Sequence, residues 1–231
     1  EAELRRGAPS ANARWRNSVA IMVGDLLFSR ASSIVATLGV DYVVLQAHTF
    51  ARLVQGQIAE LLGPVDGVDP LDHYLGVVAD KTGSLIATSA RFGGMVAGVA
   101  PEQLDALTRF GEEIGVVFQL SDDLIDITSD ATGKTPGTDL REGVRTLATL
   151  LLARSVDDAD AELRELVSRP LDDTEVPRAL AMLRAHPVLD EARAEIARRA
   201  ERARSFLAPL PDGAAKRALG DLCDAVVSRS V

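Results

Sequence analysis

Acidic residues gather at the end of an apolar stretch near the middle of the chain. The segment "FQLSDDLIDITSD", residues 118–130, holds four aspartates within nine positions, namely Asp122, Asp123, Asp126 and Asp130. In a helix, Asp122 and Asp126 are four residues apart and share a face, and Gln119 lies one turn before Asp122 on the same side. Asp123 is about 100° further round the helix, near enough to join a shared ligand.

The negative charge of this cluster needs a partner. A helix C-terminus carries partial negative charge, and two carboxylates ~4 Å apart repel by about 1 kcal/mol in water and ~4 kcal/mol at an effective dielectric of 20. A divalent cation removes that repulsion, and oxygen ligands favour Mg²⁺, with Mn²⁺ or Ca²⁺ as alternatives, over zinc. Mg²⁺ usually takes one or two carboxylates and completes its shell with water and substrate phosphate. The residues alone leave open a plainer interpretation, an acidic helix cap exposed to water.

The few lysines point to the same kind of ligand. Only three of the 25 basic residues are lysine, and two of them precede threonine, in "DKTGS" (Lys81, Thr82) and "GKTPGTD" (Lys134). A compact ammonium group suits an anionic phosphate oxygen. Arg5 and Arg6, in "LRRGAP", form a pair of guanidinium groups that could bind a diphosphate through bidentate hydrogen bonds. Solvated lysines and a surface arginine pair are the ordinary alternatives.

Composition limits the class of protein. The 231 residues are 47% hydrophobic but only 4% aromatic, which favours helices over a β-sandwich, and their number is typical of one domain, 1–231. The net charge of −9 argues against a nucleic-acid partner. Cys223 is the single cysteine, so an internal disulfide is excluded, and its surroundings are typical of a small buried hydrophobe. No apolar run reaches the ~18 residues that span a bilayer, because Asp25 interrupts the longest one.

The pattern along the chain predicts an all-α fold. We expect a loop at 1–12, apolar helices at 13–38 and 41–62, a third helix at 71–92, and a fourth that starts after Pro101 and carries the aspartates. A polar loop follows, and residues 144–231 are expected to form amphipathic, solvated outer helices. Because the first two helices are apolar on more than one face, we expect them to be buried in a bundle or at a subunit interface, and a homodimer is predicted.

Several of these segments together resemble one family. "FQLSDDLIDITSDATGKTPGTDLREG" is similar to the second aspartate-rich motif and following loop of the trans-prenyl diphosphate synthases, or polyprenyl synthetases, and "ADKTGSLIATSARFGG" is similar to their Lys-Thr helix. "ELRRGAPSANARW" resembles the stretch after their first aspartate-rich motif, and "GDLLFSRA" and "LVQGQIAELLG" resemble the helices between the motifs. The resemblance covers essentially the whole chain, and the long-chain bacterial type is the most similar. It implies an isoprenoid-synthase-type helical bundle around a central cavity.

The resemblance also implies a reaction and roles for individual residues. Such enzymes condense an allylic prenyl diphosphate with isopentenyl diphosphate, head to tail, after Mg²⁺-assisted departure of the allylic diphosphate. By this resemblance Asp122 and Asp123 bind Mg²⁺ (Mn²⁺ as the alternative), Asp126 completes the motif and Asp139 supports it. The resemblance further implies that Thr82 and Gln119 face the developing cation and that Lys81 and Lys134 hold the leaving diphosphate. It also implies that Arg5 binds the allylic diphosphate and Arg6 the isopentenyl diphosphate.

The chain departs from the family pattern at its start. In the family the first aspartate-rich motif lies just upstream of residues like "EAELRRG", whereas this chain begins at Glu1. We therefore expect the N-terminal helices to be missing, residues 1–12 to be the loop after that motif, and residues 13–143 to form the catalytic core helices and the aspartate-rich loop. With half the metal-binding apparatus, the chain by itself is expected to be weakly active or inactive.

Two other functions compete with a complete synthase. One is a non-catalytic partner subunit of a heteromeric prenyl synthase, which the intact "DDLID", "KT" and "GK" segments disfavour. The other is a terpene cyclase, disfavoured because such enzymes typically carry an Asn/Ser/Glu metal motif in place of "DDLID". The expected location is cytoplasmic, with the product delivered to membrane enzymes.

Overall fold

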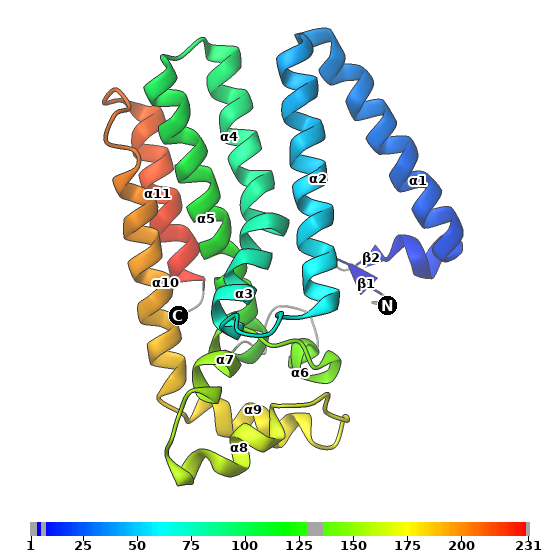
Figure 1. Ribbon diagram of the computed structural model, residues 1–231, viewed down its shortest axis with the longest axis vertical. Coiled ribbons are helices and arrows are strands. Elements are labelled where there is room, and N and C mark those ends of the chain that lie inside the picture. Colours follow the sequence, from blue (N-terminus) through cyan, green and yellow to red (C-terminus); the bar gives the residue numbers. More distant parts are fainter. Residues whose placement is uncertain (1–3, 6–7, 129–135, 230–231) are drawn as a thin grey trace.

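Helices make up nearly all of the part of the chain that the structure describes. The computed structural model describes residues 4–5, 8–128 and 136–229, with only the backbone of the first two (Figure 1). The expected loop at 1–12 contains a small antiparallel pair, β1 (Leu4–Arg5) and β2 (Ala8–Pro9). The prediction of an all-α fold is confirmed.

The helices follow the predicted order, with differences of a few residues at their ends. Their bounds are α1 Ala11–Val35, η1 (a 3₁₀ turn) Ala36–Leu38, α2 Val40–Leu62, α3 Pro70–Val78, η2 Ala79–Gly83, α4 Ser84–Ala97, α5 Pro101–Thr128, α6 Thr138–Glu142, α7 Leu147–Ala153, η3 (a 3₁₀ turn) Asp158–Asp160, α8 Ala161–Leu166, α9 Val176–Arg184, α10 Val188–Ser205 and α11 Ala214–Ser228.

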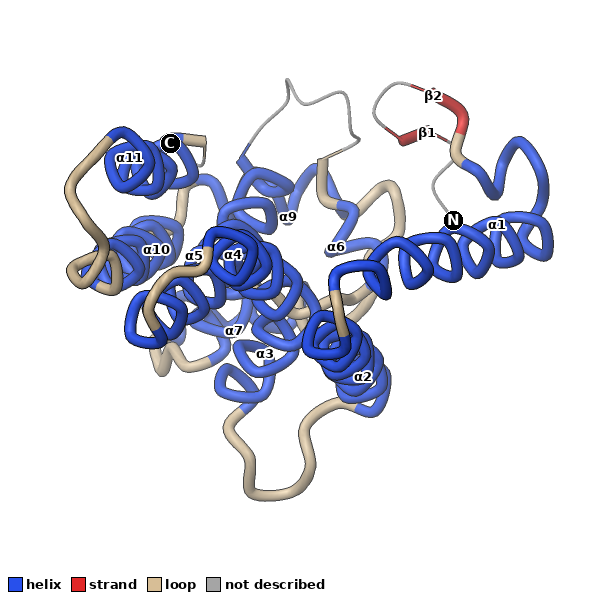
Figure 2. The backbone as a smooth tube through the Cα atoms, turned by 90° about the horizontal axis from the view of Figure 1, so that it is seen from above, coloured by secondary structure: helices blue, strands red, loops and turns tan. Residues whose placement is uncertain are grey.

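Helix α5, which carries the aspartates, lies at the centre of the fold. Figures 1 and 2 show it between α4 on one side and α10 and α11 on the other. Its face of Phe110, Ile114, Val117 and Leu120 is almost completely buried. A helix surrounded in this way has little freedom to move, so its C-terminal half is a firm support for a site.

The last third of the chain contributes more to the core than expected. Helix α7 buries Leu147 and Leu152, α10 buries Ile196 and Ala203, and all four belong to one hydrophobic cluster with α5. The description of 144–231 as solvated outer helices is therefore wrong for one face of these helices, because their small apolar residues pack closely against α5. Cys223, on α11, is buried as predicted, and burial raises the pKa of its thiol.

Three glycines bring η2 and α4 into backbone contact with α5. A Cβ atom added at Gly115 of α5 would lie 2.7 Å from the Cα atom of Gly83, and one added at Gly111 would lie 2.6 Å from the Cα atom of Ala87. A Cβ atom at Gly83 would in turn lie 3.0 Å from the carbonyl oxygen of Glu112. No side chain larger than hydrogen fits at these places without moving the helices apart.

Helix α1 is the most exposed part of the fold. None of its residues is buried, and apolar side chains such as Met22 (70% exposed) and Leu26 (68% exposed) face outward. Figure 2 shows α1 at the edge of the molecule. By length and composition alone, the stretch 11–38 would suffice to cross a membrane. The core helix of a soluble protein and a signal sequence pass the same test.

Candidate active site

The aspartates of α5 lie in its last two turns, as the sequence predicts, but each has a different environment. The side chain of Asp122 is 31% exposed, and its Oδ1 atom accepts a hydrogen bond of 2.9 Å from Arg229, just after α11. The Arg229 guanidinium also lies over the ring of Phe118, 4.9 Å from its centroid. A cation from the far end of the chain thus neutralises the first aspartate.

Asp126 forms hydrogen bonds with the residues at the start of α6, where the chain comes back beside α5. Its Oδ2 atom accepts a hydrogen bond from the backbone N–H of Asp139, and its carbonyl oxygen accepts one from Gly137. Arg184, at the end of α9, donates to the carbonyl oxygen of Ile127. The unfavourable charge at the end of α5 is therefore offset by Arg184 and Arg229 as well as by backbone donors.

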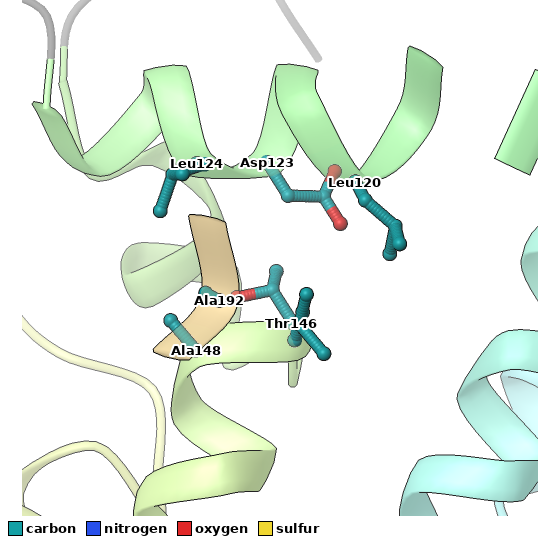
Figure 3. A pocket seen from close by; sticks show the side chains of 7 residues that line it. Leu120, Asp123, Leu124, Thr146, Ala148 and Ala192 are labelled. Carbon is teal, nitrogen blue, oxygen red and sulfur yellow. The ribbon is translucent and has the colours of Figure 1, made fainter. Parts of the chain in front are cut away.

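Asp123 has both carboxylate oxygens engaged. Tyr74, on α3, donates its hydroxyl to Oδ2, and the Gln119 amide nitrogen donates to Oδ1 at 2.8 Å. Desolvation raises the pKa of Asp123 against these two hydrogen bonds, which lower it, and the neighbouring charges of Asp122 and Asp126 raise it further. Figure 3 shows Asp123 beside a narrow gap, lined also by Thr146 and Ala148, that has no room for a water-sized molecule.

The Lys-Thr pair lies in an irregular segment of the third predicted helix. Residues 79–83 form η2, a short π-helix between α3 and α4, which the sequence pattern did not predict. Such π-segments are common at functional sites because they shift the side chains relative to a regular helix. Here η2 turns Thr82 toward α5, and its hydroxyl donates to the side-chain amide oxygen (Oε1) of Gln119 at 3.0 Å.

Charged side chains fix η2 against the neighbouring helices. Lys81 forms an ion pair with Glu60 at the end of α2, with the lysine side chain 30% exposed. Arg52, also on α2, bridges Asp80 of η2 and Glu112 of α5. The structure therefore brings Thr82 and Gln119 together with Asp123, whereas the side chain of Lys81 pairs with Glu60 of α2.

Part of the predicted site cannot be compared with the structure. Arg6 and Lys134 lie outside the described residues, and so does Asp130. Only the backbone of Arg5 is described, in β1. Their predicted roles stay predictions.

The described carboxylates fit a divalent cation that shares its shell with a substrate. Within residues 4–5, 8–128 and 136–229, no three His, Cys, Asp or Glu side chains are grouped closely enough to hold a metal by themselves. Asp122 and Asp126 are nonetheless partly accessible oxygen donors on one face of a rigid helix. This set matches Mg²⁺, which needs only one or two carboxylates when phosphate oxygens complete its shell.

Comparisons with known proteins decide the family. The model of the polyprenyl synthetase family matches residues 1–183. The chain belongs to this family. It is 50% identical over 232 residues to the nonaprenyl diphosphate synthase of Mycobacterium tuberculosis, covering 99% of this chain and 69% of that protein.

Solved structures agree with the family assignment. One is a geranylgeranyl pyrophosphate synthase from Corynebacterium glutamicum complexed with calcium and isoprenyl diphosphate, with 46% identity, a TM-score of 0.86, and coverage of 96% of this chain and 70% of that one. Another is a decaprenyl diphosphate synthase from Rhodobacter capsulatus, with 30% identity, a TM-score of 0.87, and coverage of 100% and 72%.

Membership in the polyprenyl synthetase family confirms the resemblance found in the sequence and the prediction of an enzyme of the transferase class. The relatives described above are synthases, so the alternative of a non-catalytic partner subunit has no support from them. The binding of calcium with an isoprenyl diphosphate in the Corynebacterium structure is consistent with a divalent cation.

Three contacts of the site were not anticipated from the sequence. Tyr74 is one of only two tyrosines and precedes Lys81 by seven residues, or two helical turns, a spacing that could have pointed to it. Arg229 is 107 residues from Asp122 in sequence, and Glu60 lies in "LVQGQIAELLG", 21 residues before Lys81. No local pattern distinguishes them from other charged surface residues.

Proposed function

We propose that this polyprenyl synthetase condenses an allylic prenyl diphosphate with isopentenyl diphosphate, head to tail, at the end of α5. The allylic C–O bond breaks, and the diphosphate leaves with the electron pair. The double bond of isopentenyl diphosphate then forms the new C–C bond, and a proton is lost. The observation that carries this proposal is the hydrogen bond between Thr82 and Gln119, since it places two oxygen dipoles next to the aspartates of α5.

We assign the binding of the substrate diphosphate to the partly accessible charged side chains near the end of α5 and in η2. Asp122 and Asp126, with Asp139 in support, would hold Mg²⁺, or Mn²⁺ in its place, and Arg229 must then leave Asp122. A bound divalent cation neutralises the diphosphate and makes it a better leaving group. Lys81 is the described ammonium group closest in sequence to Thr82, and it would exchange Glu60 for a phosphate oxygen.

The remaining basic residues keep the assignments that the family resemblance implies. Lys134 would stabilise the leaving diphosphate together with Lys81. Arg5 would bind the allylic diphosphate and Arg6 the isopentenyl diphosphate.

We assign to Thr82 and Gln119 the stabilisation of the positive charge on the reacting carbons, through the dipoles of their side-chain oxygens. Their hydrogen bond fixes both groups before the substrate binds. Fixed dipoles stabilise a developing positive charge without the cost of reorienting solvent.

The experiment is a diphosphate-release assay on the complete gene product with isopentenyl diphosphate and geranyl or farnesyl diphosphate. Asp122→Ala should lower the rate at least about 100-fold while helix content is unchanged. Asp105→Ala is the matched control, because Asp105 is an exposed aspartate on the same helix. A product that is inert alone but active with a second subunit would overturn the proposal, as would an Asp122→Ala variant with normal turnover.

We also propose that the protein is a cytoplasmic homodimer whose product is delivered to membrane enzymes. Support for the dimer comes from α1, where Ile21, Met22 and Leu26 are 56%, 70% and 68% exposed. Contiguous apolar surface of this kind is typical of an interface. Met22→Glu should convert a dimer into a monomer in sedimentation velocity, whereas Val156→Glu, at an isolated position 95% exposed, should not. A wild-type monomer that binds lipid vesicles would contradict this assignment.

A further inference from the structure

Four side chains from three elements form a continuous line of hydrogen bonds beneath the proposed site. Thr82 of η2 donates to Gln119 of α5, Gln119 donates to Asp123, and Tyr74 of α3 donates to the other oxygen of Asp123. We propose, on the basis of the function proposed above, that Tyr74 is a positioning residue which acts through Asp123 to orient the amide of Gln119 toward the reacting carbons.

The direction of the Gln119 amide follows from what its partners can donate. An ionised carboxylate only accepts hydrogen bonds, so the NH₂ end of the amide must face Asp123. The carbonyl end therefore faces Thr82, whose hydroxyl donates to it at 3.0 Å. Without Asp123 the amide could turn over and present its NH₂ group, whose partial positive charge would oppose a developing carbocation.

Tyr74 holds Asp123 in the rotamer that makes this possible. Its ring packs against the hydrophobic core. Its hydroxyl therefore has a fixed place between α3 and α5, where it donates its hydrogen to Asp123 Oδ2.

This arrangement separates the roles of two adjacent aspartates. Asp122 is 31% exposed, with an arginine as the partner of its Oδ1 atom, whereas both oxygens of Asp123 already accept hydrogen bonds from Tyr74 and Gln119. Asp123 was predicted from the sequence to bind metal beside Asp122. The geometry instead assigns Asp123 to orientation and leaves Asp122 as the accessible ligand of the pair.

The first test is Tyr74→Phe in the complete gene product, with Tyr42→Phe as the matched control. Tyr42 is the other tyrosine of the chain, and its ring stacks on Phe92, with 5.6 Å between the centroids. Tyr74→Phe should lower kcat about 10- to 100-fold, because a misplaced group loses that much in rate, with KM for the allylic diphosphate changed less than about threefold. In a Gln119→Leu background the same substitution should have almost no further effect. An unchanged kcat, or an equal drop in the Gln119→Leu background, would overturn the proposal.

The second test does not depend on turnover. The side-chain amide signal of Gln119 in a ¹⁵N–¹H spectrum, identified by its loss in Gln119→Leu, should shift in Tyr74→Phe and stay unchanged in Tyr42→Phe. A signal unaffected by Tyr74→Phe would contradict the proposed line of hydrogen bonds even in a protein without synthase activity. If instead the shift occurs and the wild type releases no diphosphate, the proposed reaction fails while the positioning contact stands.

The third test compares the two aspartates by titration with Mn²⁺ and inorganic diphosphate. Asp123→Asn should bind Mn²⁺ within about threefold of wild type, whereas Asp122→Asn should lose at least about tenfold, because only the latter removes a ligand. These two aspartate variants also test the proposal if Tyr74→Phe fails to fold. Equal losses in the two variants would overturn the assignment of Asp123 to positioning.

Discussion

The backbone contact between η2 and α5 gives a quantitative prediction for Gly115→Ala. The new Cβ atom would lie 2.7 Å from the Cα atom of Gly83, whereas ordinary contacts begin at 3.4 Å, so the two segments must separate by at least 0.7 Å at this point. Overpacking of this kind costs about 1–3 kcal/mol, and the higher helix propensity of alanine returns at most about 1 kcal/mol.

With the full gain in helix propensity, we expect a net loss of up to about 2 kcal/mol in the free energy of unfolding. For a chain of this length, each kcal/mol lowers Tm by roughly 2–4 °C. The same separation lengthens the Thr82–Gln119 hydrogen bond from 3.0 Å to about 3.7 Å, beyond hydrogen-bonding range. Turnover should therefore fall together with stability, by about tenfold.

The assay combines thermal unfolding with diphosphate release, and Gly93→Ala is its control. Gly93 lies on the exposed side of α4, and a Cβ atom added there meets nothing within 4 Å. This control should raise stability by about 0.5–1 kcal/mol through helix propensity and leave turnover unchanged. If Gly115→Ala proves as stable and as active as Gly93→Ala, the close contact does not position Thr82, and the reasoning is refuted.

Three further outcomes are expected. Arg229→Gln should tighten the binding of Mn²⁺ in the absence of diphosphate by up to about fivefold, because a partly exposed ion pair with Asp122 is worth at most about 1 kcal/mol. Weaker binding of Mn²⁺ to this variant in a metal titration would contradict the displacement of Arg229. Hydrogen bonds from Ser155 and then His186 lower the pKa of Asp160, so its stabilisation is present above pH ~4 and is lost as pH falls through the folded-state pKa. Asp160→Asn should therefore lower Tm at pH 7, with a difference from wild type that shrinks as pH falls below about 4. A difference that stays constant in thermal scans at lower pH would count against this. Removal of divalent cations by EDTA should abolish turnover and added Mg²⁺ or Mn²⁺ should restore it, and full activity in EDTA would exclude the proposed leaving-group chemistry.

The positions of the helices and the shared face of two aspartates could be predicted because they depend on local pattern. Apolar periodicity, Gly and Pro at the helix ends, and four-residue spacing place Asp122 and Asp126 on one face of α5 without any knowledge of the rest of the fold. The π-segment η2 was not predictable in the same way. Its backbone fits a close approach to Gly115 on another helix, and only the packed structure reveals that contact.

By itself, the amino-acid sequence determined the fold class and the family, and it predicted a site for a diphosphate with a divalent cation, since these follow from residue types at fixed spacing along the chain. Tertiary structure alone decided which partner each charged group has. Tyr74 reaches Asp123 across 49 residues, and Arg229 reaches Asp122 across 107. The physical reason is that hydrogen bonds and ion pairs act over a few ångströms in space, and packing decides which distant residues come within that range.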